Sequence, residues 1–269
     1  MEFTGFSNGL LIITGGIAAS LLLIEVARRM FHPDVLRRAH DITGNLLSVV
    51  GTLYAVLLGM IVVDAMVRFQ TAVDVVQKES NSLADIFLLA DRLPEPQKTR
   101  IKEACKSYAH LVVDKEWELM QEGKVSMEAR RQAFMLARSL NDFEPKTEAE
   151  KIVYPLLLEQ MREVWDHRRE RTGTVEYGMP AVEWIVLIVG GAVTVVFAGL
   201  FSADNNFLQR LLTTLAALLI GLNLYLVSLF GYPFTGELSV SSRPFKIDIA
   251  IFEGRFGDAP AHAQEHAGQ

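Results

Sequence analysis

Two charged side chains stand four residues apart where a long apolar segment of the chain ends. Asp64 and Arg68 follow residues 42–63, which contain no Asp, Glu, Lys or Arg. One interpretation places the pair at the mouth of an ion pore, where it would set the local charge. The other is an ion pair between residues i and i+4 of one helix at the membrane surface, which contributes only about a few tenths of a kcal/mol. The spacing favours the second interpretation and leaves the first open.

Small and hydroxylated residues recur at helical spacing within the same apolar segment. Ser48, Thr52, Ala55 and Gly59 follow one another in steps of four and three. In lipid, such residues let helices approach closely, and Ser and Thr hydroxyls can bond backbone carbonyls one turn back. The same residues can equally line a pore. Val62 and Met66 continue the line and would form an apolar constriction that gates by dewetting.

This spacing continues without a change of register into a polar part of the chain. We call the whole set of positions the seam: Ser48, Thr52, Ala55, Gly59, Val62, Met66, Phe69, Val73, Val76, Ser80, Leu83, Phe87 and Ala90. A helix over these positions is about 65 Å long, roughly twice the hydrocarbon thickness of a bilayer. Within the apolar segment up to Gly59, the residues of the seam are small or hydroxylated. Within the polar segment beyond Met66, they are mostly large and apolar. We therefore expect it to face protein or a pore throughout.

The remaining candidate groups point to no catalytic chemistry. His262 and His266 have a metal-binding spacing, but two histidines without a third ligand make a weak site. Cys105 is the single cysteine, which excludes an intrachain disulfide and a cysteine-based zinc site. Three acids on a charged segment are interpreted as a solvated face: Glu116, Glu118 and Glu122. No nucleophile–base pair, phosphate-binding loop or HExxH motif occurs. We expect neither an enzyme nor a bound metal or cofactor, and a net charge of −6 with a pI near 5.6 argues against nucleic acid.

Hydropathy places these residues in an all-α, polytopic membrane protein. Half of the 269 residues are hydrophobic and the mean hydropathy is +0.23. Four stretches contain no Asp, Glu, Lys or Arg: 3–24, 42–63, 184–203 and 211–236. They predict transmembrane helices in two hairpins, over residues 3–27, 42–66, 181–203 and 210–231. The second would continue as a long helix to about residue 92, within a helical soluble domain at 67–179. A Pro- and β-rich segment at 232–253 should dock on that domain, and residues 254–269 should be a disordered tail.

Local signals predict where helices of the soluble domain begin. Ser126 is suited to cap one helix, and Thr147 with Glu150 has the T-x-x-E spacing of a capping box. Pro155 lies within the helix that follows and is expected to kink it.

Charges near the predicted spans give conflicting signals about orientation. A short loop after the first span carries four arginines, Arg28, Arg29, Arg37 and Arg38. The positive-inside rule places that loop in the cytoplasm and the soluble domain outside. Four more arginines precede the third span and argue the other way: Arg162, Arg168, Arg169 and Arg171. Long loops count for less in this rule, so the charges favour an external domain.

Several motifs resemble those of a known family. They are the run Gly-Thr-Leu-Tyr-Ala-Val-Leu-Leu-Gly at 51–59, Glu79, Tyr108 followed by Glu116-Trp117 and Gly123, and Gly-Tyr-Pro-Phe-Thr-Gly-Glu at 231–237 followed by Pro244-Phe245. They span residues 44–246, and the last run, with Pro233, Phe234 and Gly236, is the most specific. Together they are similar to the bestrophin-like bacterial membrane proteins, a family of unknown function distantly similar to bestrophin anion channels. Many members have Asp where this chain has Gly231.

The resemblance implies a fold and a function. Bestrophins are pentameric anion channels in which two hairpins surround a helical domain, so the second span would line a fivefold pore. The chain would then be a homo-oligomeric channel for small inorganic ions, anions by this resemblance, in a bacterial inner membrane. Bestrophins carry an acidic calcium clasp after the last span, whereas the acids here are scattered: Glu237, Asp248, Glu253 and Asp258. They also keep the helical domain in the cytosol, opposite to the charge-based prediction.

A function of a different class is also open. In a membrane-anchored interaction or signalling module, the seam would only join subunits and the soluble domain would recruit a partner. A dimeric or trimeric particle without an axial opening would favour that alternative.

Overall fold

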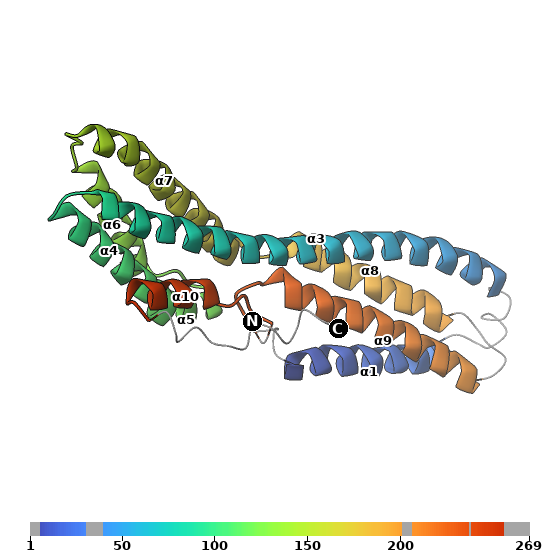
Figure 1. Ribbon diagram of the computed structural model, residues 1–269. Helices are drawn as coiled ribbons and strands as arrows, with labels where there is room; N and C mark the ends of the chain where they lie inside the picture. The colour runs from blue at the N-terminus through green and yellow to red at the C-terminus, as the bar shows by residue number, and fades with distance from the viewer. Residues whose placement is uncertain (1–5, 31–39, 201–205, 237, 256–269) are drawn as a thin grey trace. The chain divides into compact units, whose positions relative to one another are not determined.

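The computed structural model describes residues 6–30, 40–200, 206–236 and 238–255, in which helices are the regular secondary structure (Figure 1). The helices in chain order are α1 (Phe6–Met30), α3 (His40–Leu89), η1 (Ala90–Arg92), α4 (Gln97–Leu111), the π-helical turn η2 (Val112–Glu116), α5 (Trp117–Gln121), α6 (Met127–Asn141), α7 (Glu148–Tyr177), α8 (Ala181–Leu200), α9 (Asn206–Gly231) and α10 (Arg243–Phe252). No strand occurs in these ranges, so the predicted all-α class is confirmed. His262 and His266, most of the predicted tail, and residues 3–5 of the predicted first span lie outside the described residues.

The chain divides into two compact units, each described by itself. The first, here the membrane unit, comprises residues 1–69 and 177–239, and the second, here the soluble unit, comprises residues 70–176 and 240–269.

Apolar helices of membrane-spanning length identify a membrane protein. Among the described residues, three helical segments are long and apolar enough to cross a bilayer: Gly44–Arg92, Ala181–Gly199 and Phe207–Gly231. Helix α1 contains a shorter apolar stretch, Ile13–Leu22, and packs against α8 and α9.

Close packing in the membrane unit depends on glycine. A Cβ atom on Gly190 would lie 2.5 Å from the ring of Tyr54, so α8 can approach α3 here only without a side chain. The Tyr54 hydroxyl donates to the carbonyl oxygen of Leu187 at 3.0 Å, which satisfies it within the apolar core. Leu58, Met179, Leu187 and Val227 form this core with Tyr54.

Both predicted helix caps are present in the soluble unit. The Ser126 hydroxyl accepts from the backbone N–H of Ala129 at 3.1 Å. Thr147 and Glu150 exchange hydrogen bonds of 3.1 and 3.2 Å, the reciprocal pattern of a capping box. Pro155 lies inside α7.

The segment after the last apolar helix, with its Pro- and β-rich composition, contains one more helix. Residues 243–252 form helix α10, with Pro244 in the first turn where its missing N–H costs nothing. Helix α10 packs on α4, and the ring of Phe252 stacks on Phe87 with centroids 4.2 Å apart. The amphipathic spacing of Phe245, Ile249 and Phe252 supplies the buried face.

Candidate functional site

The membrane part of the seam is an uncovered face of α3. Ser48, Thr52, Ala55, Gly59 and Met66 are exposed, and Val62 is half-buried. At about 100° per residue, all six lie within about 40° of one line along the helix. Tyr54, Leu58 and Ala65, which are buried against the same chain, lie about 100° away from that line. Helix α3 therefore packs within its unit through one face and presents the seam on another.

This face carries small side chains and hydroxyl groups that bond to backbone carbonyl oxygens of their own helix. Ser48 Oγ donates to the carbonyl oxygen of Gly44 at 3.1 Å, and Thr52 Oγ1 donates to that of Ser48 at 2.7 Å. A Cβ atom on Gly59 would have no neighbour within 4 Å. The face is smooth, narrow and without an ionisable group.

Asp64 and Arg68, the charged pair at the end of this segment, lie on a different side of α3 from the seam. Arg68 Nε donates to Asp64 Oδ2 at 2.7 Å, and the guanidinium also reaches the Gly178 carbonyl oxygen at 3.3 Å and Glu183 at 3.4 Å. Both residues lie about 160° from the line of the seam. These contacts favour the anchoring interpretation of Asp64 and Arg68 over a pore mouth.

From Val76 onward the seam is covered by its own chain, whereas Val73 is 42% exposed. Val76, Ser80, Leu83, Phe87 and Ala90 are buried in the soluble unit. Ser80 Oγ donates to Asp248 of α10. The apolar residues here were expected to face protein, and the protein that covers them is the same polypeptide.

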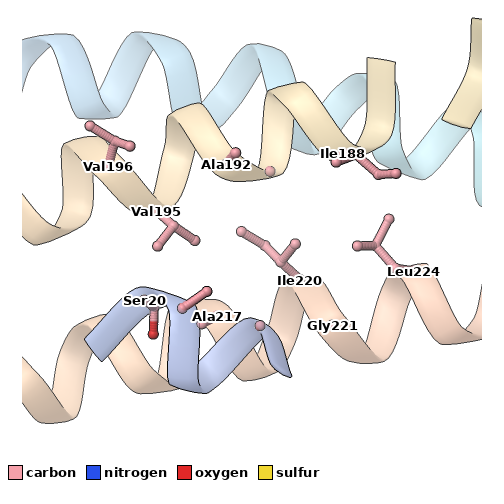
Figure 2. Close-up of a pocket in the computed structure, with 12 residues that line it drawn as sticks. Ser20, Ile188, Ala192, Val195, Val196, Ala217, Ile220, Gly221 and Leu224 are labelled. Carbon is pink, nitrogen blue, oxygen red and sulfur yellow. The ribbon is translucent and has the colours of Figure 1, made fainter. Parts of the chain in front are cut away.

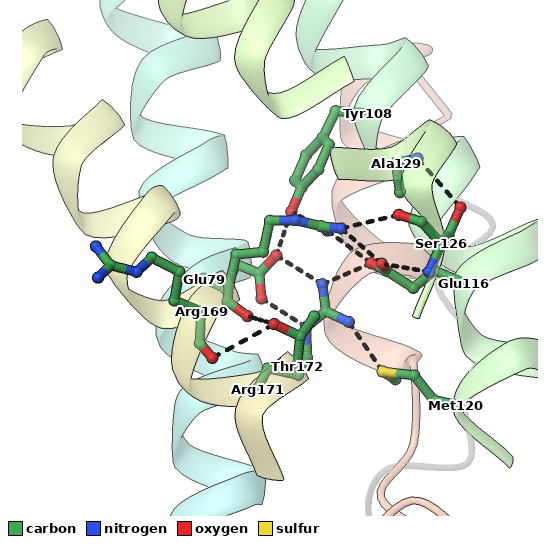
Figure 3. A network of polar contacts seen from close by, with 10 residues as sticks. Glu79, Tyr108, Glu116, Met120, Ser126, Ala129, Arg169, Arg171 and Thr172 are labelled. Atoms are coloured by element: carbon green, nitrogen blue, oxygen red, sulfur yellow. Dashed lines mark hydrogen bonds and ion pairs between the residues drawn. The ribbon is translucent and has the colours of Figure 1, made fainter. Parts of the chain in front are cut away.

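A buried cluster of four charges and a tyrosine occupies the centre of the soluble unit (Figure 3). Arg171 is bound to Glu79 through Nε at 2.6 Å and Nη2 at 2.9 Å, and its Nη2 also reaches Glu116 at 3.0 Å. Arg168 holds both oxygens of Glu116 at 2.6 Å. The Tyr108 hydroxyl donates to Glu79 and accepts from Arg168. We call Glu79, Tyr108, Glu116, Arg168 and Arg171 the charge cluster.

Electrostatics keep the charge cluster ionised despite burial. Burial opposes the charge on Glu116, but Arg171 and Arg168 outweigh it and hold the pKa of that carboxyl below its usual range. The pKa of Arg171 is raised well above its ordinary value, since Glu79 and Glu116 outweigh the same burial. Two cations and two anions balance, so the cluster joins α3, α4, η2 and α7 as a structural unit and offers no vacant charge to a ligand.

The sequence missed this cluster. Glu116 was assigned to a solvated face, which is wrong, because its side chain is fully buried between two arginines. One signal could have found the arginines: Leu157, Met161, Val164, Arg168 and Arg171 follow one another in steps of four and three. The two arginines thus continue the buried apolar face of α7.

The remaining motif residues are buried or occupy a bend of the chain. Trp117 is buried in the soluble unit, and its indole N–H donates to the Val240 carbonyl oxygen at 3.1 Å. In the membrane unit, Pro233 and Phe234 are buried, and Gly236 has φ +78°, a conformation that favours glycine.

An apolar cavity of about 400 Å³ lies among α1, α8 and α9 (Figure 2). Small residues make room for it, among them Gly16, Gly191, Ala217 and Gly221. Ser20 also lines it, and its hydroxyl donates to the Ile17 carbonyl oxygen at 2.7 Å. No feature of the sequence had indicated this cavity. Across the described residues, no group of three or more His, Cys, Asp or Glu side chains is arranged to hold a metal ion.

Comparison with known proteins identifies the family. The profile of the Bestrophin-like domain matches residues 15–245. The chain belongs to the bestrophin-like family. The family assignment covers both units, including the motif residues Glu79, Trp117 and Phe234.

Solved structures share the fold at low sequence identity. A mutated form of a bacterial bestrophin homolog from Klebsiella pneumoniae superposes with a TM-score of 0.68 at 11% identity, over 91% of this chain and 99% of that chain. Another structure of the Klebsiella homolog gives 0.67 at 12% identity, over 91% and 98%. A structure described only as a membrane protein gives 0.67 at 12% identity, over 93% and 100%. No curated protein matches the chain.

Proposed function

We propose that this protein is a homo-oligomeric ion channel of a bacterial inner membrane, with its pore lined by the membrane part of the seam. Five copies are expected by similarity to bestrophins, with four spans from each chain. Ser48, Thr52, Ala55 and Gly59 would line the conduit, and Val62 with Met66 would form its apolar constriction. Small inorganic ions, anions by that similarity, would be the permeant species.

The uncovered face of α3 carries this proposal. Packing within the chain occupies the Tyr54 face and leaves the seam exposed. A lipid-facing surface has no need of small residues, whereas helices around a narrow axis require them. Asp64 and Arg68 are omitted from the pore because Arg68, which bonds to Asp64, also bonds to Gly178 and Glu183.

Replacing Gly59 by leucine tests the pore. The added side chain meets open space within one chain, and leucine has a higher helix propensity than glycine, so folding should be unaffected. Around a symmetry axis, one leucine from every copy would close the conduit. We expect the Gly59→Leu variant to assemble normally and to lose conductance in liposomes.

The matched control is Met60→Phe, an enlargement at the next residue, which lies about 120° from the line of the seam around the helix. Met60 is exposed in the chain, and this variant should conduct like the wild type. Unchanged currents from Gly59→Leu would refute the pore assignment. A dimeric or trimeric particle with no axial opening and no wild-type conductance would favour the membrane-anchored interaction module instead.

A further inference from the structure

Helix α6 presents an exposed face that is both apolar and basic. Met127, Arg131, Phe134 and Arg138 follow in steps of four, three and four and share one side of the helix. Met127 is 67% exposed and Phe134 is 59% exposed. The opposite side carries Ala129, Ala133, Leu136 and Leu140 and is buried, with α6 packing on α4. The Met127 side is therefore not needed for packing within the soluble unit.

The positive charges of the arginines on this face are not neutralised by ion pairs within the described part of the chain. Arg130 borders the face, and in the part of the chain that the structure describes, Arg130, Arg131 and Arg138 take part in no ion pair. The neighbouring acid on α6, Glu128, lies on another side and is bound by Lys115 at 2.8 Å. We call Met127, Arg130, Arg131, Phe134 and Arg138 the basic face.

Helix α7 presents a face with the complementary chemistry. Ile152 is 70% exposed and Leu156 is 51% exposed. The acids on the same side of the helix are Glu148, Glu159, Glu163, Asp166 and Glu170. We call these seven residues the acidic face.

Ion pairs within α7 leave the acids of the acidic face available for another partner. Lys151, Arg162 and Arg169 border this face and pair with its acids at 2.8 to 3.7 Å. These pairs are solvated and worth little, so they can be exchanged at low cost. Glu170 has no such pair within the described ranges.

We propose that the basic face of one copy packs against the acidic face of the next copy in the oligomer. Each face combines two large exposed apolar side chains with charges of one sign. The charges of the two faces are opposite, so the faces are complementary. A contact between two basic faces would oppose arginine to arginine, so the contact joins different surfaces of the two chains. Such a head-to-tail contact generates a ring when the rotation from one copy to the next closes, as the proposed oligomer requires. The inference rests on the proposed homo-oligomer and adds the surfaces that hold its soluble units together.

Cysteine crosslinking in the full-length protein tests this contact. Cys105 is fully buried and is first replaced by alanine. Phe134→Cys is then combined in one chain with Leu156→Cys or with Ile152→Cys, and the purified protein is oxidised. We expect a denaturing gel to show a ladder that ends at the size of the native oligomer. Each single variant should stay monomeric on that gel, because a head-to-tail contact never brings two identical cysteines together.

The matched control combines Phe134→Cys with Leu88→Cys, an apolar position that is 57% exposed on α3 and outside both faces. This pair should give no ladder. In the crosslinking variant, reversing Arg131 and Arg138 to glutamate should lower the crosslinked fraction about fivefold or more, as the loss of several exposed charge pairs implies.

The outcomes separate the two proposals. An intact oligomer without α6–α7 crosslinks would overturn this contact and leave the channel standing. A ladder from the Leu88→Cys control, dimers from a single variant, or protection of Phe134→Cys from labelling only when anionic lipid vesicles are added would also overturn it. A wild-type protein that is monomeric and does not conduct would remove the proposed function itself.

Discussion

Arg171 offers the sharpest test of how the soluble unit is held together. Its side chain is 0% exposed and bridges Glu79 and Glu116, whereas Arg169, two residues away on the same helix, is 69% exposed and lies 3.7 Å from Asp166. Removing one partner of a buried ion pair costs about 3–5 kcal/mol, because the other charge stays buried without compensation. An exposed pair is worth less than about 1 kcal/mol.

Replacing each arginine by methionine therefore separates burial from charge. Arg171→Met strands the Glu79 carboxylate, which keeps only the Tyr108 hydroxyl from the charge cluster. At about 2–4 °C per kcal/mol for a domain of this size, its melting temperature should fall by roughly 6–20 °C. Arg169→Met should melt within about 2–4 °C of the wild type. Thermal unfolding in detergent, followed by tryptophan fluorescence, measures both. Equal melting temperatures for the two variants would refute the reasoning, since the cluster would then contribute nothing beyond a surface pair.

The remaining predictions concern pH and orientation. Burial raises the pKa of Asp248 to about 6, against a hydrogen bond from Ser80, and Asp85 raises it further. Because the folded protein then holds more protons than the unfolded chain between about pH 4 and 6, its stability should fall by about 1–3 kcal/mol as the pH rises through that range. Asp248→Asn should abolish this component and be more stable than the wild type at pH 7.5, and melting curves with an unchanged pH dependence would contradict the assignment. For orientation, the buried Cys105, whose thiol pKa is raised by burial, is unsuited as a reporter. With Cys105 replaced by alanine, an exposed Lys124→Cys should react with an impermeant maleimide added to intact cells if the soluble unit is external, whereas labelling only after lysis would place it in the cytosol.

Features specified within a few residues could be predicted from the sequence. Ser126 caps α6 and Thr147 pairs with Glu150 because each cap needs only its own turn of helix. The helix at 243–252 could not be predicted from the sequence, because β-branched and aromatic residues fit a strand or a buried helical face equally well. Contact with α4 and Phe87 decides in favour of the helix.

Partners far apart in the chain could not be predicted. Glu116 looks like any surface acid on a charged helix, and only the return of α7 brings Arg168 and Arg171 to it, 52 and 55 residues later. Arg68 likewise bonds to Glu183 at a separation of 115 residues, a contact that favours an anchor over a pore mouth.

The helical class, the apolar segments and the periodicity of the seam could all be predicted without a structure, because composition and spacing fix which face of a helix avoids water or lipid. Only the tertiary structure decided what each part of that face meets. From Val76 to Ala90 it is covered by the chain's own helices. The membrane half stays open, because Tyr54 and its neighbours use a different side of α3 for packing. Periodicity marks a buried or shielded face, but the identity of its partner depends on contacts between residues that are distant in sequence.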